Sequence, residues 1–142
     1  MKKKYLIVVA NYYKDISEGL LRSALKLIPK SDIVKVIKVP GVFEIPITIS
    51  KNIKKFDGFL ALGCVIKGET PHFELICKST FDAIMNLTVD YQKPIGNGVI
   101  TCINMSQAIK RSSKKIISLK PNKGSEAANA VISILSDESK KK

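Results

Sequence analysis

Residues 61–74 read ALGCVIKGETPHFE, and this stretch contains the change of pattern that decides the fold class. Its first half belongs to an apolar run, residues 59–66, which is typical of a strand buried on both faces. After a short polar turn, apolar side chains recur at helical spacing: Phe73, Ile76, Cys77, Phe81, Ile84 and Met85. A buried strand followed at once by an amphipathic helix predicts a unit of a parallel sheet.

The same alternation extends through the rest of the chain. Apolar and β-branched composition predicts further strands at residues 5–10, 33–39 and 99–103. Helical spacing predicts helices at residues 20–28, 43–53 and 127–135, a short helix at 107–110, and a loop at 112–123. The order βαβαβαβαα predicts a flavodoxin-like α/β fold, a three-layer α/β/α sandwich around a four-stranded parallel sheet. We expect residues 1–142 to form one domain.

The formal net charge of +12 raises the question of a nucleic-acid partner. Nearly all of this charge is lysine, because Arg22 and Arg111 are the only arginines. A protein that reads nucleic acid is expected to use arginine for bidentate contacts and aromatic residues for stacking. We therefore interpret the charge as a lysine-rich, solvated surface that attracts small anions, and we expect no nucleic-acid partner.

Cysteine and histidine usage limits the kinds of site. The cysteines, Cys64, Cys77 and Cys102, stand at wide and irregular spacing, and His72 is the only histidine. Neither a disulfide framework nor a metal site is predicted. The apolar run near the N-terminus ends at Ala10, too short for a membrane span and without a cleavage-like site. We expect a cytoplasmic protein with no membrane partner.

The fold class predicts where a ligand binds, because ligands of such sheets lie beyond the carboxyl ends of the strands. The segments expected to meet there are residues 11–13, 40–44, 67–72 and the end of the fourth strand near Thr101. Tyr12 and Tyr13 could stack on a planar ligand or cover the rim of the cleft. Phe43 and Glu44 could contribute to the site, or serve core packing and a favourable charge in a first helical turn.

Residues 67–72 have the features of an anion site. Thr70 is expected to cap the following helix, Pro71 to take its first position, and Gly68 to let a ligand approach free backbone N–H groups. His72 falls in the first turn, where a neutral imidazole is favoured and can accept a proton near neutral pH. The pattern also fits an ordinary strand–turn–helix with a surface histidine, so both interpretations stay open at this point.

Several segments together resemble the motifs of lumazine synthases. In chain order they are PGVFEIPI at residues 40–47, ALGCVIKGETPHFE at 61–74, PIGNGVIT at 94–101, QAIKR at 107–111 and NKGSEAA at 122–128. The resemblance covers essentially the whole chain. It implies the condensation of 5-amino-6-(D-ribitylamino)uracil with 3,4-dihydroxy-2-butanone 4-phosphate in riboflavin biosynthesis. This transferase reaction gives 6,7-dimethyl-8-ribityllumazine, releases water and phosphate, and uses no metal or organic cofactor.

The resemblance also implies which residues bind the uracil substrate. Tyr12 matches an aromatic residue that stacks on the pyrimidine ring. The segment that holds the ribityl chain is matched by Val42, Phe43 and Glu44. The segment that binds the uracil largely through backbone groups is matched by Cys64, Val65 and Ile66.

Other matches concern the phosphate and the proton. Glu69 and Thr70 match the phosphate site, which Arg111 completes with a guanidinium suited to a bidentate contact. His72 matches the residue that transfers protons. Lys123 and Glu126 match polar residues near the reacting end of the site.

Some positions depart from the family pattern. Asn97 stands where many members have an aromatic residue, so a stacking contact supplied by a neighbouring subunit is in doubt, and Lys67 replaces a common arginine. Residues 112–121 are longer and differently composed than the family's linker, and only residues 1–4 precede the first strand. The last two features favour a homopentamer over a sixty-subunit capsid. In the family the active site lies between adjacent subunits, so a closed homo-oligomer is expected either way.

Two other functions compete with this interpretation. A riboflavin synthase of the archaeal kind shares the fold and would convert the lumazine further. A ligand-binding or regulatory paralogue, or a basic nucleic-acid-binding module, would bind without turnover. The low arginine content and the retained polar residues, Glu44, Thr70, His72, Arg111 and Lys123, weigh against the latter.

Overall fold

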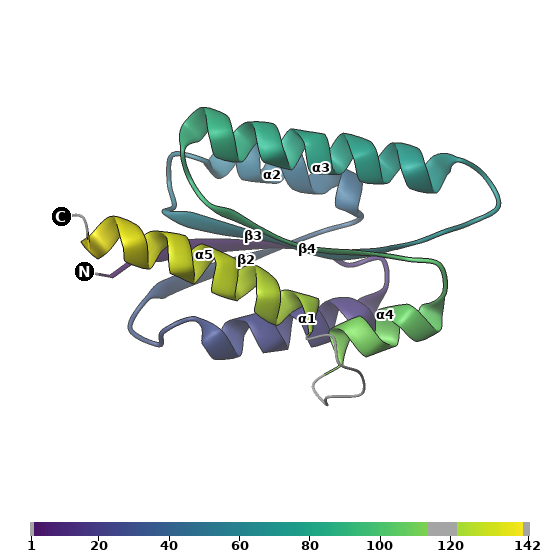
Figure 1. Ribbon diagram of the computed structural model, residues 1–142, viewed down its shortest axis with the longest axis horizontal. Helices are drawn as coiled ribbons and strands as arrows, with labels where there is room; N and C mark the ends of the chain where they lie inside the picture. Colours follow the sequence, from purple (N-terminus) through teal and green to yellow (C-terminus); the bar gives the residue numbers. More distant parts are fainter. Residues whose placement is uncertain (1, 114–121, 141–142) are drawn as a thin grey trace.

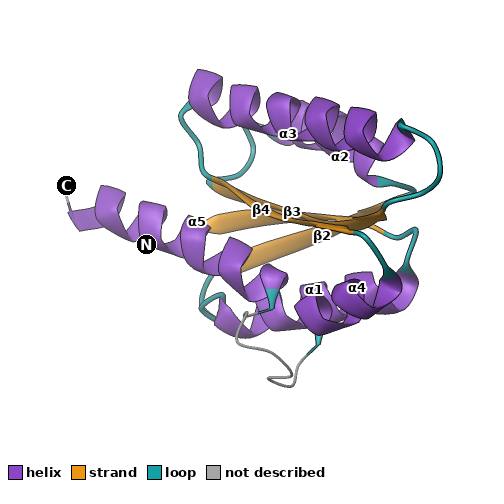
Figure 2. Ribbon diagram, turned by 45° about the vertical axis from the view of Figure 1, so that its right-hand side comes forward, coloured by secondary structure: helices purple, strands orange, loops and turns teal. Residues whose placement is uncertain are grey.

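The computed structural model describes residues 2–113 and 122–140, and it confirms the predicted order of elements. In chain order these are β1 (Lys4–Ala10), α1 (Lys14–Leu27), β2 (Ile33–Val39), the 3-10 helix η1 (Val42–Glu44), α2 (Ile45–Asn52), β3 (Gly58–Ile66), α3 (His72–Tyr91), β4 (Ile95–Cys102), α4 (Met105–Ser112) and α5 (Lys123–Lys140). The strands form one parallel sheet in the order β2-β1-β3-β4. Helices α2 and α3 cover one face, and α1, α4 and α5 cover the other (Figures 1 and 2). The predicted flavodoxin-like α/β/α sandwich is therefore confirmed.

The two central strands carry the core, as their apolar sequences predicted. Alternate side chains of β1 point to opposite faces, so Leu6 and Val8 pack with α2 and α3 while Ile7 and Val9 pack with α1 and α5. The edge strand β2 is different, because Ile33 is 47% exposed. The burial on both faces expected for the run at residues 59–66 does not extend to β2, where Lys35 and Lys38 interrupt the apolar residues on opposite faces, as on a solvated edge.

The fourth strand begins earlier than its sequence predicted, at Ile95 rather than at residue 99. The segment before residue 99 contains two glycines, Gly96 and Gly98, yet it is paired in register with β3, with Ile95 opposite Phe59. Glycine is required here because α5 lies close to the sheet. A Cβ atom on Gly96 would stand 2.3 Å from the carbonyl oxygen of Ala127. The small residue therefore serves helix–sheet packing within a strand.

Helix ends are set by local capping chemistry. Helix α2 begins at Ile45, two residues later than predicted, because Pro46 lacks a backbone N–H and suits only a first turn. Helix α5 begins directly after Asn122, whose Oδ1 accepts hydrogen bonds from the backbone N–H groups of Gly124 at 2.7 Å and Ser125 at 3.2 Å. Of the predicted loop at 112–123, the ends belong to helices, and residues 114–121 lie outside the described part of the chain.

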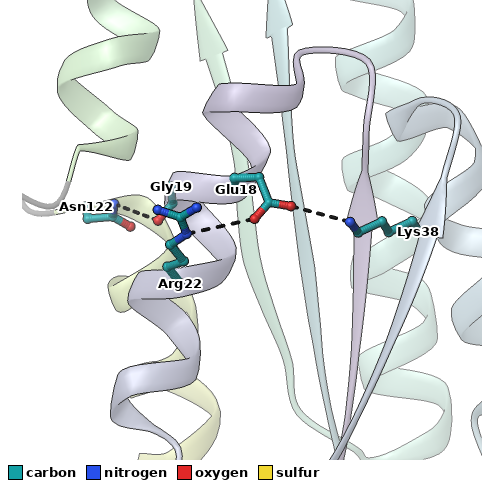
Figure 3. Close-up of polar contacts among 5 residues, drawn as sticks. All are labelled: Glu18, Gly19, Arg22, Lys38 and Asn122. Carbon is teal, nitrogen blue, oxygen red and sulfur yellow. Dashed lines mark hydrogen bonds and ion pairs between the residues drawn. The ribbon is translucent and has the colours of Figure 1, made fainter.

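Helix α1 is linked to its neighbours by exposed polar contacts, shown in Figure 3. The Glu18 carboxylate lies 3.9 Å from Arg22 Nε on the same helix and 3.4 Å from Lys38 Nζ on β2. Asn122 Nδ2 donates to the carbonyl oxygen of Gly19 at 3.5 Å. Exposed ion pairs of this kind contribute about 0–1 kcal/mol each, so α1 is held mainly by its buried apolar face.

No helix within residues 2–113 and 122–140 combines the length and apolarity that a membrane crossing requires.

Candidate active site

One cleft opens at the carboxyl ends of the strands, at the edge where α3 begins. Its volume of about 640 Å³ suits a small molecule. The walls come from the β1–α1 connection, the segment from Gly41 through η1, the end of β3, and the turn that leads into α3. Three of the four segments expected to meet thus line one cleft, while the end of β4 near Thr101 does not.

Most of the residues singled out from the sequence are brought together here. Those lining the cleft are Tyr12, Val42, Phe43, Glu44, Cys64, Val65, Ile66, Thr70 and His72. The lining also includes Tyr13, Gly41, Gly68, Phe73 and Ile76. Helical spacing predicted Phe73 and Ile76 only as part of the apolar stripe of a helix. Such spacing does not distinguish a core-facing residue near a helix start from one that reaches a cleft.

The remaining singled-out residues lie outside this cleft: Glu69, Asn97, Arg111 and Lys123. Asn97 is half-buried in β4, and its side-chain oxygen accepts from the backbone N–H of Val99 at 3.1 Å. Arg111 lies in the last turn of α4, and Lys123 pairs with Glu126 at 3.2 Å in the first turn of α5. These side chains therefore do not line the cleft of their own chain.

Close packing against the sheet positions the corner that carries Phe43 and Glu44. A Cβ atom on Gly63 would stand 2.8 Å from Val42 Cγ1 and 2.9 Å from Ala10 Cβ, so glycine in β3 lets η1 lie directly on the strand ends. The Thr48 hydroxyl donates to the carbonyl oxygen of Glu44 at 2.9 Å, which fixes the start of α2. The Glu44 carboxylate is thus supplied to the cleft by a tightly packed segment rather than by a free loop.

The turn from β3 to α3 is tied to the sheet at its start. The backbone N–H of Lys67 donates to the carbonyl oxygen of Cys102 at 2.8 Å, which joins the ends of β3 and β4. No described glycine has a positive φ, so Gly68 is not needed for the turn itself. No atom lies within 4 Å of the position that a Gly68 Cβ would take. Open space beside this backbone is what an approaching anion needs.

The cap of α3 differs from the prediction. The helix begins at His72 with Pro71 as its N-cap, one position later than expected, because the weak hydrogen bond from the His72 N–H to Thr70 Oγ1 spans 3.4 Å. In that contact the Thr70 oxygen is the acceptor, so its own proton remains available to a ligand oxygen. His72 is exposed and is the first residue of this long helix, at its positive end.

Two buried thiols, Cys64 and Cys102, lie near the carboxyl ends of β3 and β4, and Cys64 is part of the cleft lining. Burial raises the pKa of Cys64 to about 12, and the neighbouring Cys102 thiol adds to the shift. Burial also raises the pKa of Cys102, while the nearby Arg111 guanidinium and the Cys64 thiol act in the opposite direction. A thiol that stays protonated is a poor nucleophile, so Cys64 contributes shape and backbone groups.

These shifts predict a loss of stability in alkali. Burial raises the pKa of Cys64 from 9.0 to about 12 and that of Tyr5 from 10.0 to about 12. Both groups hold their protons more tightly when folded, so their contribution is fully present below pH 9 and is lost as pH rises towards 12. The urea midpoint should fall across this range, and less steeply in Cys64→Ser. If the urea midpoint of Cys64→Ser falls as steeply as that of the wild type, the contribution assigned to the Cys64 thiol is contradicted. Cys77→Ser serves as the control, because the Cys77 thiol is less buried.

Within the described residues, no three histidine, cysteine, aspartate or glutamate side chains gather as metal ligands. The cleft is lined by the hydroxyl-bearing Thr70, the imidazole-bearing His72 and the carboxylate-bearing Glu44, beside aromatic side chains. This flavodoxin-like chain, with polar and aromatic groups in a cleft at its carboxyl edge, has the form of an α/β protein that binds small molecules.

Comparison with known proteins gives the family. The family model of 6,7-dimethyl-8-ribityllumazine synthase matches residues 2–138. The 6,7-dimethyl-8-ribityllumazine synthase of Bartonella bacilliformis is 42% identical over 135 residues, 92% of this chain and 86% of that protein. That of Bartonella tribocorum is 40% identical over 141 residues, 95% of this chain and 91% of that protein. The chain belongs to the 6,7-dimethyl-8-ribityllumazine synthase family, whose members are transferases of riboflavin biosynthesis, and the resemblance of its motifs is confirmed.

Proposed function

We propose that the cleft condenses 5-amino-6-(D-ribitylamino)uracil with 3,4-dihydroxy-2-butanone 4-phosphate to form 6,7-dimethyl-8-ribityllumazine. The observation that carries the proposal is that His72, Thr70 and Glu44 line one cleft together with two tyrosines and Phe43. Family membership indicates which reaction to expect. The residues that line the cleft include groups suited to uracil binding, phosphate binding and proton transfer. Holding two substrates side by side in one cleft accounts for much of the acceleration.

The uracil substrate takes the part of the cleft between β1 and β3. The ring of Tyr12, which is 75% exposed, is free to stack on the pyrimidine ring. Backbone groups at the end of β3, from Cys64 to Ile66, bind the ring edge. The ribityl chain extends along the η1 corner, where Val42 and Phe43 pack against its carbon chain and the Glu44 carboxylate accepts hydrogen bonds from its hydroxyl groups.

The phosphorylated ketone takes the turn before α3. Backbone N–H groups beside Gly68, the Thr70 hydroxyl and the helix dipole bind the phosphate, and Glu69 contributes through its backbone N–H rather than through its carboxylate. This turn positions the ketone and stabilises the phosphate as it departs. The amine of the uracil then attacks the ketone carbonyl, and a first water leaves as the imine forms. His72 transfers the protons that phosphate loss and ring closure require, and ring closure releases a second water.

A second copy of the chain completes the site in this proposal. Asn97, Arg111 and Lys123 stand outside their own cleft and are available to the cleft of a neighbouring subunit. Large apolar side chains are exposed at both places such contacts would use. At the cleft rim they are Phe43 and Ile47, and beyond β4 they are Ile103, Met105 and Ile109. Exposed apolar patches of this kind mark interfaces, and a repeated head-to-tail contact closes into a ring.

The ring proposed here is a homopentamer in the cytoplasm, rather than a sixty-subunit capsid. Three free cysteines fit a reducing compartment. Five chains of 15.6 kDa give a particle of about 78 kDa. Light scattering should find this mass, whereas a monomer or a particle many times heavier would contradict the pentamer.

Turnover with both substrates tests the proposed function. Lumazine absorbance and inorganic phosphate should increase together, and neither should appear when one substrate is left out. Incubation with the lumazine alone should give no riboflavin, which separates this activity from that of a riboflavin synthase of the archaeal kind. Substrate binding without any release of phosphate would contradict the proposal and favour a binding protein.

A further inference from the structure

Tyr13 lines the cleft, but none of the roles above uses it. Its ring meets that of its neighbour Tyr12 edge to face, with centroids 4.9 Å apart and an angle of 77° between the planes. The Tyr12 side chain is 75% exposed, so most of its surface faces solvent or the open cleft. The Tyr13 ring is therefore the aromatic contact through which the protein can restrict the orientation of the Tyr12 ring.

The Tyr13 side chain is itself anchored. It packs against the core cluster between the sheet and helices α1 and α5, and the residue is partly buried, whereas Tyr12 is exposed. Its backbone is fixed as well, because Tyr13 is the N-cap of α1 and its carbonyl oxygen accepts from the backbone N–H of Ser17 at 2.9 Å. The side chain makes no capping hydrogen bond, so helix capping does not account for a tyrosine at this position.

We propose that Tyr13 is a positioning residue that holds the Tyr12 ring in the orientation that stacks on the pyrimidine ring of the uracil substrate. An exposed tyrosine loses rotamer freedom when it binds a ligand, and a ring that is already held loses less. The inference rests on the proposed function, because it assigns the stacking partner to that reaction.

This role predicts which kinetic constant depends on Tyr13. The phosphate turn, with Gly68 and Thr70, belongs to a different wall of the cleft, and the proton is transferred at His72. Loss of the ring contact therefore weakens binding of the uracil and leaves the phosphorylated ketone and the chemical step nearly unaffected. A general distortion of the cleft would change all three.

The test compares Tyr13→Leu, which removes the ring, with Tyr13→Phe, which keeps the ring and removes the hydroxyl. An edge-to-face pair accounts for about a three- to ten-fold effect, so Tyr13→Leu should raise the KM for the uracil by that factor. The KM for the ketone and kcat should stay close to wild type. Tyr13→Phe should behave as wild type throughout. A Tyr13→Phe variant as impaired as Tyr13→Leu would overturn the role of the ring.

A double-mutant cycle shows whether Tyr13 acts through Tyr12. In a Tyr12→Leu background, Tyr13→Leu should add almost nothing to the rise in KM, and its full effect there would overturn the proposal. Binding of the lumazine product, followed by its fluorescence, repeats the comparison without turnover. Tyr13→Met replaces Tyr13→Leu if that variant does not fold. An inactive wild-type chain would refute the proposed function, whereas an active wild type with an unchanged Tyr13→Leu would refute this inference alone.

Discussion

Replacement of His72 by glutamine is expected to lower kcat by about 100-fold or more, the contribution typical of a positioned general acid or base. Glutamine retains polarity and hydrogen-bonding ability but cannot take up and release a proton near neutral pH. His72 is the only histidine, so no other imidazole in the chain can replace it. Because the substrates are bound by other groups, both KM values should change much less than kcat. Steady-state rates of lumazine formation measure the effect.

A matched control lies on the same helix. Lys78 is exposed on α3 and pairs with Asp82 at 2.7 Å, outside the cleft lining. The Lys78→Gln variant should turn over at the wild-type rate and should unfold at the same temperature as the His72 variant. A His72→Gln chain that keeps nearly all of its kcat would remove His72 from the mechanism.

Arg111 is expected to act in the cleft of a neighbouring subunit. Arg111→Ala is expected to raise the KM for the phosphorylated ketone by about ten-fold or more, since a charge-assisted contact to phosphate contributes about 1.5–3 kcal/mol. Its guanidinium lies outside its own cleft, so the proposed assembly pairs it with the His72 of another copy. The wild-type pairing is therefore restored when Arg111→Ala and His72→Gln chains share one assembly.

Mixing the two variants tests this pairing. When they are unfolded together and refolded in equal amounts, about a quarter of the interfaces should combine an intact His72 with an intact Arg111. At a ketone concentration below the wild-type KM, the mixture should regain about that share of the wild-type rate, although each variant refolded alone stays impaired. A mixture no more active than the mean of the separate variants would show that both residues serve the cleft of their own chain.

The sequence was sufficient for the layers of the fold and for much of the cleft. Continuous apolar runs identify β1 and β3, and helical spacing identifies α3. Because ligands of parallel sheets bind at the carboxyl ends of the strands, this order of elements predicts that Tyr12, Glu44 and His72 lie together. The start of β4 was missed because Gly96 satisfies the packing of α5, a distant contact that local pattern does not encode. The cap of α3 was displaced by one residue, within the usual uncertainty of helix ends.

The other residues singled out from the sequence do not line the cleft of their own chain. Asn97, Arg111 and Lys123 were singled out by motif alone, and their own fold holds them away from the cleft. The sequence predicted Tyr13 only as a second stacking residue or as a residue that covers the rim of the cleft. Its edge-to-face contact with Tyr12 depends on the backbone path into α1, which the sequence pattern does not specify. Periodicity and spacing predict which helices and strands form. They do not predict which side chain contacts and orients another side chain in the cleft.

A crystal structure of the wild-type chain with the lumazine product and inorganic phosphate examines the cleft most directly. We expect the bicyclic ring beside Tyr12 and the end of β3, the ribityl hydroxyl groups at Glu44, and the phosphate at the backbone of Gly68 to Thr70 within reach of His72. A well-ordered product bound elsewhere on the protein, with this cleft empty, would contradict the account.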